Sequence, residues 1–138
     1  MSSYVELGRR LWDSAEGGFV EWKTQEILVE GFRNEGFEVE PFGDIPGFLS
    51  RWPGVDSPRV ALITDMDALP LEGETYRHMC GHHQQLTALL ATATEIQSRA
   101  PELLEAVSFI AFPGEEYVEL QRREEIRASG TITYLSGK

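Results

Sequence analysis

The sequence contains few cysteine, histidine and basic residues, and this scarcity excludes several classes of protein. It has 1 Cys, 3 His and 12 Lys and Arg against 23 Asp and Glu, which gives a net charge of −11. A single cysteine cannot form an intramolecular disulfide, and it excludes a zinc site made of four cysteines. Such an acidic chain argues against a nucleic-acid partner, because proteins that bind nucleic acids usually carry clustered Lys and Arg that contact the phosphates.

Long apolar runs are also missing. No stretch approaches the length of a membrane span, and residues 1–6 lack the basic and apolar pattern of a leader peptide. We therefore expect no membrane partner and a cytoplasmic location. The 138 residues, 41% of them hydrophobic, are enough for one domain that buries a core.

Hydrophobic spacing predicts a mixture of helices and strands. Helical periodicity favours helices over residues 4–16, about 20–34 and 83–99. Apolar or alternating runs predict strands at 37–42, 47–52, 60–63 and 107–112. The run at 60–63 is continuous, which favours a strand covered on both faces. Residues 66–81 read mostly as loop, 131–135 have β-type composition, and 117–128 fit either an extended edge or a solvated helix.

This order of elements predicts an α/β layered domain with its ligands at the carboxyl ends of the central strands. Asp65 and Asp67 follow one predicted strand, and the pair at 115–116, both Glu, follows another. Cys80 and His82 stand at the start of the helix that joins those two strands. We therefore expect the three segments to converge on one site.

Cys80 and His82 are separated by a glycine, which lets the backbone turn tightly enough for both side chains to reach one ion. The alternative for Cys80 is a small buried apolar residue, as most free cysteines are. His83 is either a polar residue at the helix start or a contact to ligand or substrate. His78 is expected to be solvated.

Glu115 and Glu116 follow Pro113-Gly114, where the backbone can turn so that both carboxylates face one cavity. One would then bind a metal ion while the other removes a proton from water. The alternative is an exposed acidic turn. Asp65 and Asp67 either orient a ligating histidine or cap the turn that follows them.

Three segments resemble successive motifs of one family. They are 64–70 (Thr-Asp-Met-Asp-Ala-Leu-Pro), 78–83 (His-Met-Cys-Gly-His-His) and 112–116 (Phe-Pro-Gly-Glu-Glu). In order and spacing they resemble the aminoacylase and carboxypeptidase G family of metallopeptidases. The likeness is to its amidohydrolase branch, which includes hydrolases of indole-acetyl-amino acids and of aminobenzoyl-glutamate.

The resemblance implies a layered αβα zinc-peptidase-like domain with a mixed central sheet. By position, Cys80 matches a metal-bridging thiolate, His82 a second ligand and Glu116 a ligating carboxylate. Glu115 matches the catalytic base, and Asp67 matches the aspartate that orients a ligand. The family usually has Asp where His83 stands and His at position 85, where this chain has Gln85. This difference bears on substrate preference, and it leaves Asp65, His83 and Gln85 as candidates for supporting contacts.

The resemblance also implies that residues 1–138 are the N-terminal segment of a catalytic domain. A lid and dimerisation domain and two further histidine ligands would lie beyond it. The implied function is metal-dependent hydrolysis of amide bonds in N-acyl amino acids or small peptides, with zinc as the divalent ion or manganese as the alternative. The short chain is expected to be inactive and to form a homo-oligomer through residues 117–135. A non-catalytic binding or assembly domain is the alternative.

Overall fold

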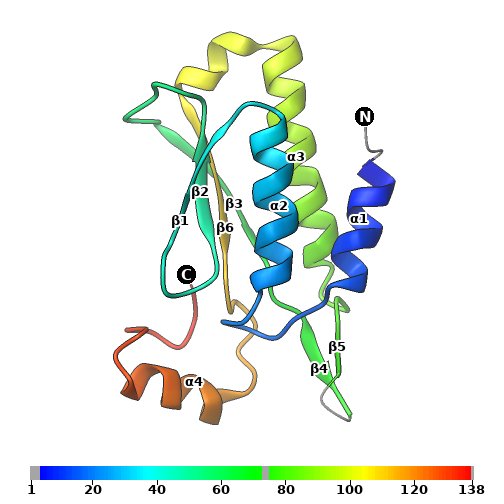
Figure 1. The fold of residues 1–138 in the computed structure, drawn as a ribbon, viewed down its shortest axis with the longest axis vertical. Coiled ribbons are helices and arrows are strands. Elements are labelled where there is room, and N and C mark those ends of the chain that lie inside the picture. Colours follow the sequence, from blue (N-terminus) through cyan, green and yellow to red (C-terminus); the bar gives the residue numbers. More distant parts are fainter. Residues whose placement is uncertain (1–3, 73–74, 138) are drawn as a thin grey trace.

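The computed structural model describes residues 4–72 and 75–137, and its main feature is a four-stranded sheet in the order β1-β2-β6-β3 (Figure 1). Its strands are β1 (Glu38–Pro41), β2 (Phe48–Arg51), β3 (Val60–Asp65) and β6 (Val107–Phe112). β1 and β2 form an antiparallel hairpin, β2 pairs antiparallel with β6, and β6 pairs parallel with β3. The predicted mixed α/β fold is therefore confirmed.

The helices lie together against one face of this sheet. They are α1 (Tyr4–Asp13), α2 (Trp22–Asn34) and α3 (His82–Arg99), and the short 3-10 helix η1 (Pro101–Glu105) leads into β6. α2 contacts β1 and β2, α3 contacts β3 and β6, and α1 packs on α3 (Figure 1). Within the described part of the chain, no helix has the length and apolar character needed to cross a membrane.

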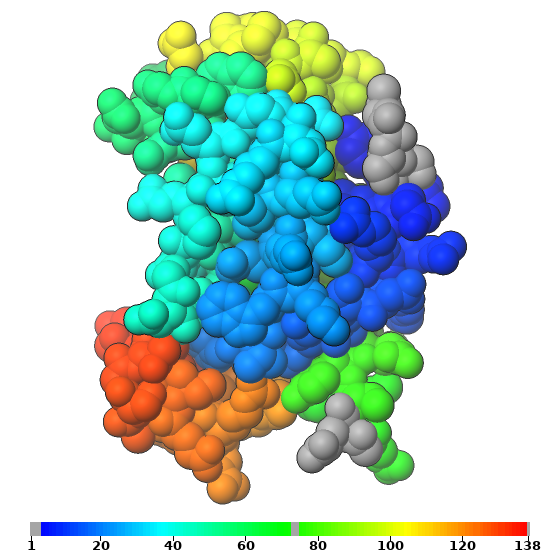
Figure 2. All heavy atoms as spheres, viewed as in Figure 1, coloured from blue at the N-terminus to red at the C-terminus, as the bar shows by residue number. Residues whose placement is uncertain are grey.

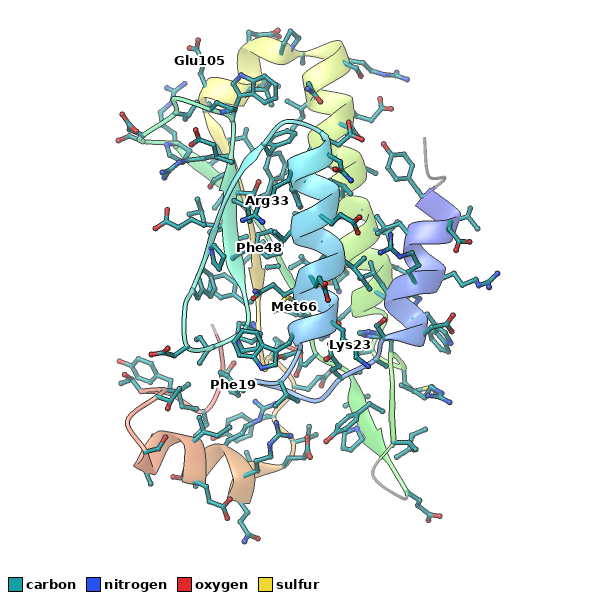
Figure 3. All side chains as sticks on the ribbon, in the orientation of Figure 1. Phe19, Lys23, Arg33, Phe48, Met66 and Glu105 are labelled. Atoms are coloured by element: carbon teal, nitrogen blue, oxygen red, sulfur yellow. The ribbon has the colours of Figure 1, made fainter. Side chains whose placement is uncertain are left out.

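Aromatic packing between α2 and the sheet makes the centre of the core. Phe32 of α2 is fully buried, and its ring lies 5.6 Å from the rings of Phe48 and Phe109 and 5.7 Å from that of Phe37. Rings at such distances attract one another in addition to the area that they bury. Met66 completes this core just beyond the end of β3, so the packing reaches the edge where the polar motifs lie (Figure 3).

The β3-α3-β6 unit places the candidate residues. α3 returns the chain from β3 to β6, and the two strands run parallel, with Asp65 opposite Phe112 at their carboxyl ends. The residues that follow both strands therefore meet at one edge of the sheet, beside the first turn of α3. This convergence follows directly from the predicted strand-helix-strand pattern.

Several local expectations were wrong. β3 is the edge strand of the sheet rather than a strand covered on both faces, and Val60 and Ile63 keep 50% and 52% of their surface exposed. The region read as loop contains a small hairpin of β4 (Leu69–Leu71) and β5 (Thr75–Arg77), although residues 73–74 lie outside the described chain.

The C-terminal region also differs from expectation. The undecided segment forms helix α4 (Leu120–Ala128), and residues 131–135 form bends instead of a strand. In the space-filling view this segment, orange to red, packs at the lower end of the molecule beneath α2 and the β1-β2 turn (Figure 2). Ile132 is buried there at 8% exposure within the chain itself.

Candidate metal centre

Two backbone turns bring the candidate ligands together at the sheet edge. Gly81 has φ +89°, a left-handed conformation that glycine adopts easily, and it caps α3 between Cys80 and His82. Gly114 has φ +61° immediately after β6, where it redirects the chain toward Glu115 and Glu116. Both turns are the ones that the sequence predicted from the Gly residues.

The structure brings together two overlapping groups of potential ligands. One contains Cys80, His82 and Glu116, and the other contains Asp65, His82 and Glu115; within each group, one ligand atom per residue lies within 4.8 Å of the others. Thiolate, imidazole and carboxylate at this spacing form a donor set suited to a divalent transition metal ion. The donor chemistry therefore fits the metal that the resemblance implies.

His82 is held in one orientation by Asp67. The backbone carbonyl of Asp67 lies 2.9 Å from Nδ1, and because a carbonyl only accepts, Nδ1 carries the proton. The other nitrogen, Nε2, lies 3.8 Å from Glu115 and 3.9 Å from Glu116. Burial alone would lower the pKa of His82, but the hydrogen bonds to the side chain and carbonyl of Asp67 raise it to about 9.

Asp67 connects two of the three segments. It is fully buried, its Oδ2 accepts the backbone N–H of Glu116 at 2.9 Å, and its Oδ1 lies 3.5 Å from Nδ1 of His82. Burial by itself would raise the pKa of Asp67. The hydrogen bonds from His82 and from the Glu116 and Glu115 backbone outweigh burial and lower that pKa, so the carboxylate stays charged.

Cys80 is a half-buried free thiol beside these carboxylates. Its Sγ lies 3.6 Å from the carbonyl of Asp67. Burial raises the pKa of the thiol, and the negative charges of Glu116 and Asp67 raise it further. A cation at this position would reverse that electrostatic balance, because a thiol that coordinates a metal ion binds as the thiolate and releases its proton to solvent.

The remaining predicted residues lie around this centre rather than in it. His83 packs edge-to-face on Trp12, with ring centroids 4.9 Å apart, and lines a groove of about 450 Å³ between α1 and α3. Gln85 accepts a hydrogen bond from the Thr64 hydroxyl at 3.3 Å. His78, expected to be solvated, is 1% exposed, and burial lowers its pKa to about 4, so it is neutral.

Two buried ionisable residues at the site were missed by the sequence analysis. Glu21 precedes α2 and is fully buried, and Arg123 in α4 is 1% exposed. Arg123 lies 3.5 Å from Oδ2 of Asp67. No local pattern marks either residue, because Glu21 stands alone in a loop and Arg123 lies within a run of charges that reads as solvated.

Curated proteins similar in sequence to this chain include a deacetylase and an amino acid hydrolase. The chain is 33% identical to the N-acetyldiaminopimelate deacetylase of Oenococcus oeni, a match covering 71% of this chain and 30% of that protein. It is 28% identical to the IAA-amino acid hydrolase ILR1-like 2 of Arabidopsis thaliana, over 93% of this chain and 31% of the relative. No protein-family model matches the chain.

Solved structures show the same fold. The Bacillus subtilis YXEP protein, described as a dinuclear metal binding peptidase from the M20 family, superposes with a TM-score of 0.73 at 23% identity. That match covers 94% of this chain and 39% of the solved chain. The chain is thus related in sequence to a deacetylase and an amino acid hydrolase, and it shares the fold of an M20 peptidase, as its motifs predicted. It spans about a third of the length of the curated relatives it matches.

Proposed function

We propose that this chain is the N-terminal part of the catalytic domain of a metal-dependent amidohydrolase and that it contributes Cys80, His82 and Glu116 as metal ligands. The observation that carries the proposal is that these three side chains, from two separate segments, lie within 4.8 Å of one another. The kinship with deacetylases and M20 peptidases supports the same role.

The described residues offer ligands for one ion at a time. The two groups share His82, whose Nδ1 is engaged by Asp67, so that only Nε2 can ligate an ion, and it does so by losing its own proton. We infer zinc for the group with Cys80, because thiolate and imidazole favour it. The group of Asp65, His82 and Glu115 is richer in oxygen and suits manganese better.

A divalent ion held by Cys80, His82 and Glu116 would supply Lewis-acid polarisation of the substrate carbonyl. Glu115 is the general base: its carboxylate, about a third exposed beside Nε2 of His82, takes a proton from the attacking water and returns it to the leaving nitrogen. Asp67 orients His82 and fixes the backbone of Glu116. Substrates are N-acyl amino acids or small peptides, in keeping with the relatives.

The metal site is tested by titrating the purified chain with Co²⁺, which gives an absorption band when a thiolate binds it. We expect a band that Cys80→Ser abolishes and His82→Ala weakens. His83→Ala is the matched control and should keep the band, because His83 packs on Trp12 rather than on the carboxylates. A wild-type chain that takes up Co²⁺ without a thiolate band would contradict the proposed ligand set.

Hydrolysis is tested separately with N-acetyl and N-benzoyl amino acids in the presence of zinc or manganese. We expect this chain alone to be nearly inactive, because a catalytic zinc normally has three protein ligands and a co-catalytic pair needs more. Turnover that disappears in Glu115→Gln would show instead that the described residues suffice for catalysis.

We also propose that the chain assembles into a homo-oligomer, and that assembly is its role if it lacks activity. The support is the outer edge of β3, which pairs with no strand among the described residues and where Val60 and Ile63 are exposed. This edge suits an interface better than residues 117–135, where Ile132 is already buried. A cytoplasmic location is proposed because a reducing compartment keeps the Cys80 thiol available.

A further inference from the structure

Both backbone groups of Gly114 are bound by buried ionisable side chains. Oε1 of Glu21 accepts the N–H of Gly114 at 2.7 Å, and Nη1 of Arg123 donates to the carbonyl of Gly114, also at 2.7 Å. Glu21 is 0% and Arg123 1% exposed. The two residues come from opposite ends of the chain, and they meet at the residue directly before Glu115.

Burying these two groups is unfavourable unless each is well paired. Burial raises the pKa of Glu21 to about 8, so this carboxyl is largely neutral at pH 7 and binds Gly114 without adding a negative charge beside Asp67. Arg123 remains charged, and Nη1 also donates to the carbonyl of Leu135 at 2.8 Å. Its guanidinium stands 5.4 Å from the centre of the Phe19 ring, which lies near α4 (Figure 3).

Arg123 also reaches the other end of the same turn. Its Nη2 lies 3.5 Å from Oδ2 of Asp67, and that oxygen accepts the N–H of Glu116. Gly114 and Glu116 are therefore both fixed through one guanidinium, directly in the first case and through Asp67 in the second. The carboxylates of Glu115 and Glu116 project from the segment held between these two points.

We propose that Glu21 and Arg123 are positioning residues that hold the Gly114–Glu116 turn in the conformation required for Glu116 and Cys80 to bind the same metal ion. This inference rests on the proposed function, since it assumes that Glu116 is a ligand. It goes beyond that function by assigning α4 and the loop before α2 to the metal site. A purely structural role, in which Arg123 only ties Leu135 to the domain, predicts no effect on metal binding.

The test is the affinity of the full chain for Co²⁺, followed by the thiolate band and by calorimetry. Loss of a contact that orients a metal ligand typically weakens affinity about 10- to 100-fold, and we expect this for Arg123→Met and Glu21→Ala. Glu21→Gln keeps an acceptor for the Gly114 N–H and should stay within about threefold of wild type. Arg123→Lys keeps the charge but not the forked geometry, so partial rescue is expected.

Two controls separate positioning from stability. Leu104→Ala removes a buried side chain in η1, at the end of the domain opposite the site, and should lower stability without changing Co²⁺ affinity. Arg127→Ala removes an exposed arginine from the same helix as Arg123. Circular dichroism of each metal-free variant verifies folding. If Arg123→Met does not fold, Arg123→Lys and Glu21→Ala carry the test of metal affinity in its place.

The outcomes are distinguishable. Wild-type protein that fails to give the thiolate band overturns the proposed function itself. Wild-type protein that binds Co²⁺ through Cys80, while the folded Arg123 and Glu21 variants bind equally tightly, overturns only the positioning role. Weaker binding in those variants, with unchanged binding in Leu104→Ala and Arg127→Ala, supports it.

Discussion

Asp67 and Arg123 form an ion pair in which both side chains are almost completely buried, with 3.5 Å between Oδ2 and Nη2. Ion pairs on protein surfaces contribute little to stability, but breaking a buried pair leaves one charge without a partner in a medium of low dielectric constant. The pair lies between β3 and α4, and it therefore joins the edge of the sheet that carries the candidate metal site to the C-terminal helix.

The first prediction concerns the strength of this pair. Asp67→Asn leaves Arg123 buried without an opposite charge and should lower the free energy of unfolding by about 3 kcal/mol. In the double variant with Arg123→Met the losses should not add, because one partner is already gone; a coupling energy of about 1.5 kcal/mol or more is expected. The four proteins of this double-mutant cycle are wild type, the two single variants and the double variant. Urea unfolding of each in the metal-free state measures the free energies that the cycle needs.

The control cycle uses an ion pair with similar separation but high exposure. Arg10 and Glu30 are 3.2 Å apart, and their side chains are 45% and 57% exposed. Their coupling should stay below about 1 kcal/mol. Equal coupling energies in the two cycles would contradict the importance assigned to burial.

The second prediction concerns Gly114. A methyl group there would lie 2.5 Å from the Phe19 ring, and the residue has φ +61°. Gly114→Ala should therefore cost about 2–4 kcal/mol, from backbone strain and displacement of Phe19. Gly130→Ala is the matched control: its φ is +83°, but nothing lies within 4 Å of the added carbon, so only the strain of about 1 kcal/mol is expected. Similar losses in both variants would argue against the tight packing at Gly114.

These contacts explain why the sequence predicted only part of the site. The ligand-bearing turns are local features: Gly81 separates Cys80 from His82, and the apolar runs of β3 and β6 bracket a helix with clear periodicity. By contrast, the hydrogen bond between Glu21 and Gly114 joins residues 93 positions apart. No local pattern encodes such a contact, so the residues that hold the site could not be predicted.

For a related reason the sequence did not decide whether residues 117–128 form a helix or an extended edge. Most exposed positions of helix α4 are polar, and its buried residue is Arg123 rather than an apolar stripe. The β4-β5 hairpin was missed because its strands are only three residues long, too short for an alternating pattern. His78 was assigned to solvent because its burial depends on tertiary packing that the sequence does not display.

The third prediction concerns pH. Glu21 has a pKa of about 8 in the folded chain, against an ordinary value near 4.5. Between these values the folded state keeps a proton that the unfolded state has released, so this group makes the protein less stable as pH rises. Its contribution is constant below about pH 4.5 and fully lost above about pH 8, with a slope of at most ~1.4 kcal/mol per pH unit.

Glu21→Gln removes the titratable carboxyl group. It therefore also removes the part of the pH dependence of stability that Glu21 causes. The difference in unfolding free energy between Glu21→Gln and wild type should therefore grow in favour of the variant by roughly 3–4 kcal/mol from about pH 5 to about pH 8. Urea unfolding of both proteins at several pH values measures it, and the titrations of other groups largely cancel in the difference. A difference that does not change with pH would show that Glu21 ionises normally.

The last prediction concerns association through β3. This strand pairs with β6 on one side, while its other side has no strand partner within residues 4–72 and 75–137. Ile63 is 52% exposed on that strand, and an unpaired edge with exposed apolar side chains favours pairing with another copy. We expect wild-type chain to sediment as a dimer or larger species at micromolar concentration and Ile63→Lys to shift it toward the monomer.

Val5→Lys is the matched control for this change. Val5 is an apolar residue of α1 that is 82% exposed, away from β3. Both lysine substitutions reduce the magnitude of the net charge of −11 by one, so a general effect of charge would weaken repulsion equally and promote association in both. Dissociation seen only in Ile63→Lys therefore locates the interface at β3. Wild-type protein that remains monomeric across this concentration range would exclude this interface, because the free edge would then be too weak to hold a second copy.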